Sequence, residues 1–250
     1  IVDWILRETG TEMWFSEPAG MLNASRTTLR VYHTPEIQKI VDEMVTRFTR
    51  SETDSASFGI RMITLDNPNW RTRALSRLRP VSVQTPGADA WLCSHEDAAL
   101  ILMDLRTRSG FREHNSANLL VRNGDHHTIQ RTQPTSYVRG IRLLGGRNPV
   151  GGMDMAQFDE GFTLNVSPLL ARDPNEVDVV IRIDSQQIEK LTSIAVPAPT
   201  TVNSRQMSNV QVPQTSSWRL HERFRWPASQ VLLISCGMVA SPGPERPAPR

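Results

Sequence analysis

The sequence predicts an α+β fold, in which a small N-terminal α/β domain precedes a larger, β-rich part. Three observations support this class. One amphipathic helix pattern lies between residues 35 and 48, strand signals dominate after residue 110, and two alternating segments form a hairpin between Gly161 and Ile183. The chain has 250 residues, 38% of them hydrophobic and 22% charged, which is enough for one large or two small domains.

Residues 1–50 are predicted to form the small α/β domain, with its N-terminal part missing. A helix is expected over residues 1–10 with Gly10 as its C-cap, and a short strand over residues 28–32. Thr34, Pro35 and Glu36 then supply an N-cap, a proline at the first helical position and an acid in the first turn. The helix that follows places its apolar residues at helical spacing: Ile37, Ile40, Val41, Met44, Val45 and Phe48.

Residues 51–110 are predicted as a connecting α/β segment. A polar, Ser/Thr-rich run over residues 50–57 indicates a loop or a domain boundary, and short strands are expected within residues 58–65 and 84–93. Ser94 is expected to cap a helix, with Asp97 three residues later. The predicted buried stripe of this helix is Ala98, Ala99, Ile101, Leu102 and Leu105.

Residues 111–240 are predicted as the β-rich domain. The Asn123–Gly124 turn between two apolar runs, 118–122 and 127–131, predicts a β-hairpin. Residues 132–160 lack periodicity and are rich in glycine, so they are expected to form a functional loop inserted in the domain. The residues of interest in this loop are Tyr137, Gly140, Gly145, Gly146, Gly151 and Gly152.

The hairpin after this loop has one apolar face, made by Phe162, Leu164, Val166, Val177, Val179, Ile181 and Ile183. Such a face needs a second sheet, a helix layer or lipid to cover it. Residues 188–209 show little periodicity, and closing strands are expected at 210–212, 218–226 and 231–238. The proline-rich tail, residues 241–250, cannot join a strand ladder.

Composition excludes several classes of function. The net charge of +2 is too small to indicate nucleic-acid binding, and no apolar run approaches the roughly 20 residues of a spanning helix. The chain begins at Ile1 without Met or a signal-peptide pattern, which predicts a mature or trimmed product.

No group of residues predicts catalysis, a metal or a cofactor. Cys93 with His95 suggests a nucleophile and a base, but both fit better as structural residues, and Cys236 is predicted as a small buried residue. His126 and His127 point to opposite faces of a strand, so even with His114 nearby they predict no metal site. The loop carboxylates are expected to be solvated, and the alternative is that they set the charge of a constriction: Asp154, Asp159 and Glu160.

The order of these pieces resembles the bacterial secretins, the ring-forming outer-membrane channels of type II and III secretion and type IV pilus systems. The similarity rests on residues 118–129 (NLLVRNGDHHTI), 158–170 (FDEGFTLNVSPLL) and 227–239 (PASQVLLISCGMV). Upstream, residues 29–45 (LRVYHTPEIQKIVDEMV) resemble the strand and helix of the periplasmic ring domains that precede such channels.

The resemblance implies a non-enzymatic subunit that gives strands to a barrel shared by identical copies, in the outer membrane or cell envelope, with its N-terminal domain in the periplasm. Residues 132–160 would be the gate, and the partners would be identical subunits, outer-membrane lipid and other secretion or envelope proteins. Trp218 and Trp226 would mark the membrane interface.

Two alternatives stay open from the sequence. One is a scaffold or docking ring that keeps this fold and conducts nothing, and the other is a soluble β-rich hydrolase or binding protein that uses Cys93 or the histidines. Length argues against a full membrane span, since strands of about seven residues, tilted by about 45°, rise only roughly 16 Å against an apolar band of about 25 Å.

Overall fold

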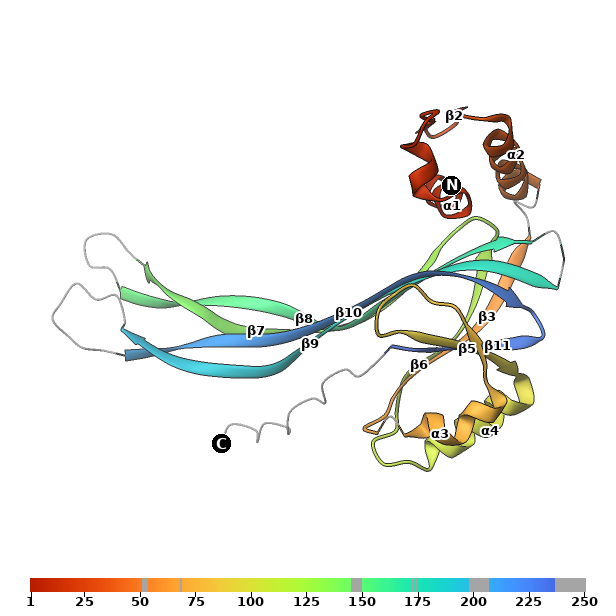
Figure 1. Ribbon diagram of the computed structural model, residues 1–250. Coiled ribbons are helices and arrows are strands. Elements are labelled where there is room, and N and C mark those ends of the chain that lie inside the picture. Colours follow the sequence, from red (N-terminus) through yellow and green to blue (C-terminus); the bar gives the residue numbers. More distant parts are fainter. Residues whose placement is uncertain are drawn as a thin grey trace.

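The structure is a computed structural model that describes residues 1–50, 54–67, 69–144, 150–171, 173, 175–197 and 207–236. The fold is α+β and rich in strands, as predicted, and its described strands form four separate sheets and no closed barrel. Figure 1 shows a body from which one long sheet projects, with a helical unit above the body and a second helical layer below it.

The N-terminal unit confirms the expected helices and strand. Gly10 ends the first helix with a φ of 81°, and the buried residues of the second helix, Ile37, Val41 and Met44, belong to the predicted stripe. The strand β1 was not predicted. The elements are α1 (Val2–Thr9), η1 (Thr11–Trp14), β1 (Met21–Ala24), β2 (Leu29–Tyr32) and α2 (Pro35–Arg50).

The middle of the chain supplies the second helical layer. The Ser94 hydroxyl accepts a hydrogen bond from the Asp97 amide at 3.0 Å, which confirms the predicted cap. Ile101 and Leu105 are buried, but Ala99 is exposed, because it lies on the opposite side of the helix. The elements are β3 (Ser55–Thr64), α3 (Trp70–Ala74), η2 (Leu75–Arg77), β4 (Arg79–Val81), β5 (Asp89–Ser94) and α4 (His95–Arg106).

The long sheet is an antiparallel meander in the order β10-β9-β8-β7. Its strands are 18 to 22 residues long: β7 (His127–Leu144), β8 (Val150–Leu170), β9 (Glu176–Pro197) and β10 (Met207–Pro227). The prediction of a loop over residues 132–160 is therefore wrong, because the described part of this segment belongs to the β7–β8 hairpin. Residues 188–197 and 207–209 are strands as well, while the proline-rich tail lies outside the described residues.

The Asn123–Gly124 turn joins two sheets and does not form the predicted hairpin. The strand before it, β6 (Arg112–Arg122), pairs with β3, whereas β7 pairs with β8. Asn123 is buried and its side-chain Nδ2 donates to the Arg47 carbonyl at 2.9 Å, while its side-chain oxygen accepts from the Leu170 amide at 2.7 Å. These tertiary contacts override the local hairpin preference of the dipeptide.

Both faces of the sheet are covered where it joins the body. The predicted apolar face, from Phe162 to Ile183, lies against β3, β6 and the small sheet β11-β5-β4, and the opposite face, with Leu169 and Val180, lies against α1 and α2. Two further sheets, β3-β6 and β11-β5-β4, therefore cover the apolar face within the chain itself. The expected closing strand, β11 (Gln230–Ser235), pairs with β5 in the body.

The two tryptophans predicted at a membrane interface belong to this core. Trp218 and Trp226 are half-buried among the core residues, the Trp226 ring lies 5.5 Å from that of Phe58, and its indole N–H donates to the Gln230 carbonyl. Core packing within the body accounts for the partial burial of both rings, so their position gives no support to the prediction of a membrane girdle.

Candidate assembly site: the edges and fork of the long sheet

The long sheet has two edge strands, β7 and β10, whose outer backbone groups have no neighbouring strand in the sheet order of the described residues. Long edges are templates for pairing with another chain, and most proteins shorten or cover them. At 18 and 21 residues, β7 and β10 are about three times the usual strand length. These edges are the feature of the fold that most needs a partner.

The sheet divides into two hairpins outside the body. The β8–β9 ladder runs from Leu170–Val177 to Gly161–Gln186 and stops there, although each strand stays paired with its outer neighbour. We call the part of β7–β10 beyond this last pair the arm. We call the point at which the sheet divides the fork (Figure 1).

Two residues define the fork. Gly161 has a φ of +138°, and a Cβ there would lie 2.0 Å from the Arg131 carbonyl oxygen, so only glycine fits. Beside it, the Glu160 carboxylate accepts a hydrogen bond from the Ile188 amide at 2.6 Å and another from the Thr135 hydroxyl at 2.8 Å. Glu160 thereby connects β7, β8 and β9.

In the arm the two edge strands approach each other. The Val138 amide of β7 donates a hydrogen bond to the side-chain oxygen of Gln211 on β10, at 3.0 Å. The strong twist of the sheet thus brings its own edges together without closing a barrel.

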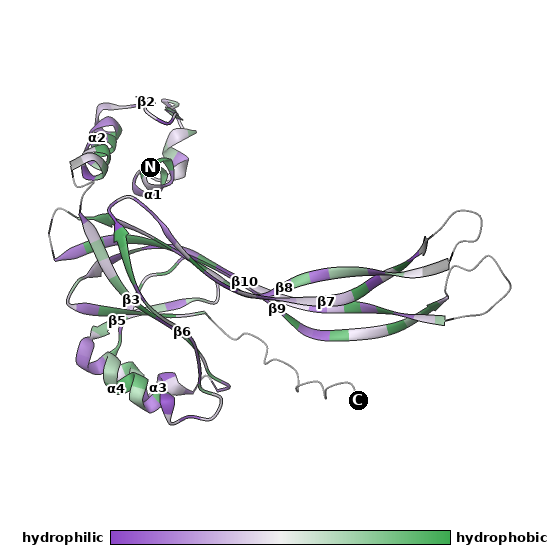
Figure 2. Cartoon of the chain, turned by 180° about the vertical axis from the view of Figure 1, so that it is seen from behind, coloured by the Kyte–Doolittle hydropathy of each residue, from purple (hydrophilic) through white to green (hydrophobic). Residues whose placement is uncertain are grey.

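Large apolar side chains are exposed on both hairpins of the arm. Met153 is 67% exposed and Met155 55%, and Ile194, Met207 and Val212 are between 47% and 56% exposed. Figure 2 shows apolar and polar segments alternating along the arm, with no layer covering it. Apolar groups exposed in this way mark contact surfaces for proteins or lipid.

Charged pairs link the edge strands to the inner strands. Arg139 on β7 pairs with Asp154 on β8 at 2.8 Å, and Arg219 on β10 pairs with Asp184 on β9 at 3.1 Å. The hydrogen bond from Arg139 lowers the pKa of the Asp154 carboxyl. Asp154 and Glu160 therefore have protein partners, contrary to the expectation of solvated loop acids.

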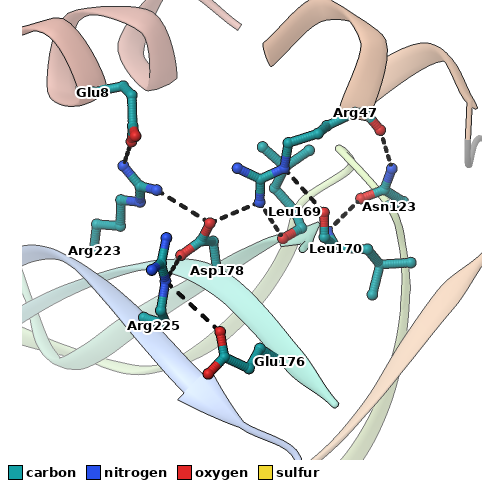
Figure 3. A network of polar contacts seen from close by, with 9 residues as sticks. All are labelled: Glu8, Arg47, Asn123, Leu169, Leu170, Glu176, Asp178, Arg223 and Arg225. Atoms are coloured by element: carbon teal, nitrogen blue, oxygen red, sulfur yellow. Dashed lines mark hydrogen bonds and ion pairs between the residues drawn. The ribbon is translucent and has the colours of Figure 1, made fainter. Parts of the chain in front are cut away.

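An ionic cluster at the base of the sheet attaches the N-terminal unit (Figure 3). Asp178 of β9 is buried, and its carboxylate faces Arg47 of α2 at 2.7 Å, Arg223 at 3.1 Å and Arg225 at 3.6 Å. Arg223 also pairs with Glu8 of α1. The three arginines and three acids of this cluster, Glu176 included, balance in charge.

Burial alone would raise the pKa of the Asp178 carboxyl, but hydrogen bonding from Arg47 and the positive charges of Arg223 and Arg47 outweigh it and lower the pKa. Arg47 also donates to the carbonyls of Leu169 and Leu170, the last residues of β8. The cluster therefore fixes the base of the long sheet against α1 and α2.

The residues predicted for the gate lie in regular strands where they are described. Tyr137 and Gly140 belong to β7 and Gly151 and Gly152 to β8, whereas Gly145 and Gly146 lie outside the described residues.

The alternative catalytic groups do not come together. Burial raises the pKa of the Cys93 thiol, with a further contribution from Asp97, and burial raises the pKa of Cys236 to about 12. Both thiols are therefore poor nucleophiles at neutral pH. Across the described parts of the chain no three His, Cys, Asp or Glu side chains gather to hold a metal.

Glu160, Asp178 and Asn123 organise this region, and the sequence reasoning gave none of them such a role. The sequence does contain a pattern that predicts a paired carboxylate at Asp178. This residue lies within an apolar strand segment, Val177 to Ile181, where burial requires a charged partner.

No helix in the described residues is both long and apolar enough to cross a membrane. Comparison of the chain with protein-family models, curated proteins and solved structures finds no match.

Proposed function

We propose that the chain is a structural, non-enzymatic subunit of a homo-oligomeric, secretin-like ring that forms a pore in the outer membrane or cell envelope for the export of macromolecules. The observation that carries the proposal is the pair of long edges, β7 and β10, on one sheet. Because the sheet has one edge strand at each side, head-to-tail pairing is possible, in which β10 of one copy meets β7 of the next and every edge is satisfied.

Strand length supports a shared barrel wall. The part of β8 in the arm, residues 150–160, extends over roughly 36 Å at about 3.3 Å per residue, and a tilt near 45° leaves a height of roughly 26 Å. This matches the apolar band of about 25 Å, which the seven-residue strands expected from the sequence do not reach. The exposed side chains of Met153 and Met155 lie in the half of β8 that is furthest from the body.

Electron microscopy of the full chain extracted in detergent tests the proposal. We expect rings with a central lumen, because a single copy leaves both edges without a partner. A monodisperse monomer at every concentration and in every detergent would contradict it.

A non-conducting scaffold ring is the second candidate. It is favoured by one observation, which is that residues 132–144 and 150–160, expected to form a gate, are regular strands of the long sheet. Conductance in planar bilayers separates the two candidates: a pore gives discrete steps, whereas rings that insert without current identify the scaffold.

A further inference from the structure

Helix α4 is apolar on more sides than the body covers. Its residues 98–103 are all apolar, and Ile101 and Leu105 are buried against the sheet β11-β5-β4. Leu100 is nevertheless 44% exposed and Met103 65% exposed. The layer of α3, η2 and α4 lies on the side of the body opposite to the N-terminal unit, and no described element covers its outer side (Figure 1). A helix with such a second apolar side is expected to have a partner.

The exposed side chains of α4 form one stripe along the helix. They follow the spacing i, i+3, i+4, i+7 and i+11, which places them on one face, and all five are exposed: Glu96, Ala99, Leu100, Met103 and Thr107. We call these five residues the outer stripe. It is acidic at its N-terminal end, apolar in its middle and polar at its C-terminal end.

A cavity of about 440 Å³ adjoins the C-terminal end of the outer stripe. Thr107, Arg73, Asp104 and Arg108 are among the residues that line it. Arg108 donates two hydrogen bonds to the Asp104 carboxylate, at 3.1 and 2.9 Å. Arg73 lies 3.5 Å from the same carboxylate, and its side chain is 79% exposed. Two guanidinium groups therefore share one carboxylate, so this end of the stripe carries a net positive charge.

The outer stripe is complementary to itself when its direction is reversed. If Leu100 of one helix lies opposite Met103 of another, Glu96 comes opposite Thr107, because both pairs are centred between residues 101 and 102. The Glu96 carboxylate then faces the positive cavity of the other copy, and the two helix macrodipoles are antiparallel. A parallel pair would instead place two Glu96 side chains next to each other.

We propose that α4 pairs antiparallel with α4 of a second copy of this chain, through the outer stripe, in a two-fold symmetric dimer. Leu100 and Met103 of each copy form the apolar centre of the contact, and the small Ala99 lets the helices approach closely. Each contact occurs twice, as the symmetry requires. The dimer leaves the edges of β7 and β10 free, so it does not rest on the proposed ring.

The charge of the stripe favours a second copy over lipid. Glu96 would repel anionic headgroups, whereas membrane-surface helices carry Lys and Arg along their polar face. The contact is small, since α4 has 12 residues and is about 18 Å long. One helix pair buries less than the roughly 1,200 Å² of a stable complex, so the dimer is weak.

Cross-linking of a single introduced cysteine tests the proposal in the full chain. The two copies of Met103 are about 4.5 Å apart along the paired helices. Met103→Cys with a short bis-maleimide should therefore give about tenfold more covalent dimer than Leu120→Cys, because pairing raises the effective thiol concentration. Leu120 is the matched control, as it is 72% exposed but lies on β6. The parent chain, whose two thiols are shielded, is the blank. Equal yields would overturn the proposal.

A charge exchange isolates the contact between Glu96 and the cavity. Glu96→Lys and Arg73→Glu should each lower the dimer yield of Met103→Cys about fivefold, since each charge meets its partner twice in the symmetric dimer. Combining the two substitutions should restore the yield, which a merely structural effect of either change would not do. A combined variant that dimerises as poorly as the single ones would overturn the antiparallel register.

Further measurements separate the dimer from the ring and from lipid. Met103→Asp should remove the dimers and leave rings in electron micrographs; rings that vanish together with the dimers would place α4 in the ring contact and overturn the two-fold dimer. Dimers without rings would support the pairing of α4 and contradict the ring. Binding to vesicles of phosphatidylethanolamine and phosphatidylglycerol that Met103→Asp abolishes, without cross-linked dimers, would identify lipid as the occupant and overturn the proposal.

Discussion

Asp178 holds three guanidinium groups that would otherwise repel one another at the junction of the N-terminal unit and the long sheet. Its side chain is 1% exposed, and those of Arg47 and Arg223 are 16% and 18% exposed. Breaking a buried pair by removing one partner leaves uncompensated charge.

Asp178→Asn should therefore lower the free energy of unfolding by about 3–5 kcal/mol, measured by urea titration with tryptophan fluorescence. Asp184→Asn is the matched control on the same strand, since its partner Arg219 is 75% exposed, and it should cost no more than about 1 kcal/mol. Equal losses in the two variants would show that the cluster adds nothing to stability.

The pH dependence of this junction follows from the lowered pKa of Asp178. A carboxyl whose folded pKa is depressed stabilises the fold above its ordinary pKa of 3.8 and loses that contribution as the pH falls through the folded value. The stability difference between the wild-type chain and Asp178→Asn should thus be constant at neutral pH and shrink below pH 3.8. Unfolding curves between pH 2 and 7 measure it, and a difference that grows on acidification would contradict the assignment.

At the scale of elements, the fork depends on Gly161 and its close approach to the Arg131 carbonyl. Gly161→Ala should destabilise the fold by about 1–3 kcal/mol, because the Cβ is strained at this φ and collides with backbone. Gly140→Ala is the control in the same sheet, since no atom lies within 4 Å of its Cβ position, and its midpoint of thermal unfolding should change little. A stable Gly161→Ala chain would mean that the fork tolerates a side chain.

Helices α2 and α4 were predictable because each buries one face and begins with a start signal, Pro35 and Glu36 in α2 and the Ser94 cap in α4. The arm was not predictable by the same means. A strand shows hydropathy alternation when its buried face is apolar, but in this part of β8 Asp154 is half-buried whereas Met153 and Met155 are exposed. Glycines at 140, 151 and 152 then gave the appearance of a loop.

The candidate site, too, was predictable from the sequence only in part. The apolar face from Phe162 to Ile183 was found from its period of two, but its cover, β3 and β6, depends on contacts distant in sequence. The hairpin predicted at Asn123–Gly124 was wrong for the same reason, because a dipeptide preference does not specify which strands will pair. The role of Glu160 needs the three-dimensional neighbourhood of Ile188 and Thr135.

At the scale of the whole molecule, the proposed ring would depend on the outward amides of the edge strands. The Val138 amide points away from β8, so Val138→Pro removes an edge donor and leaves the β7–β8 ladder intact. This variant should fold and yield few or no rings in electron micrographs. Val138→Ala keeps the amide and should assemble like the wild-type chain; rings from both variants would exclude this part of β7 from the subunit contact.

The meander of the long sheet has a consequence for how the chain folds during synthesis. Its four strands are consecutive, so they can pair soon after they leave the ribosome, whereas β5 must wait for β11, the last described strand. The arm is therefore complete before the body is closed. The contact between Val138 and Gln211 then shields two long edges at the stage when a nascent chain is most prone to aggregate.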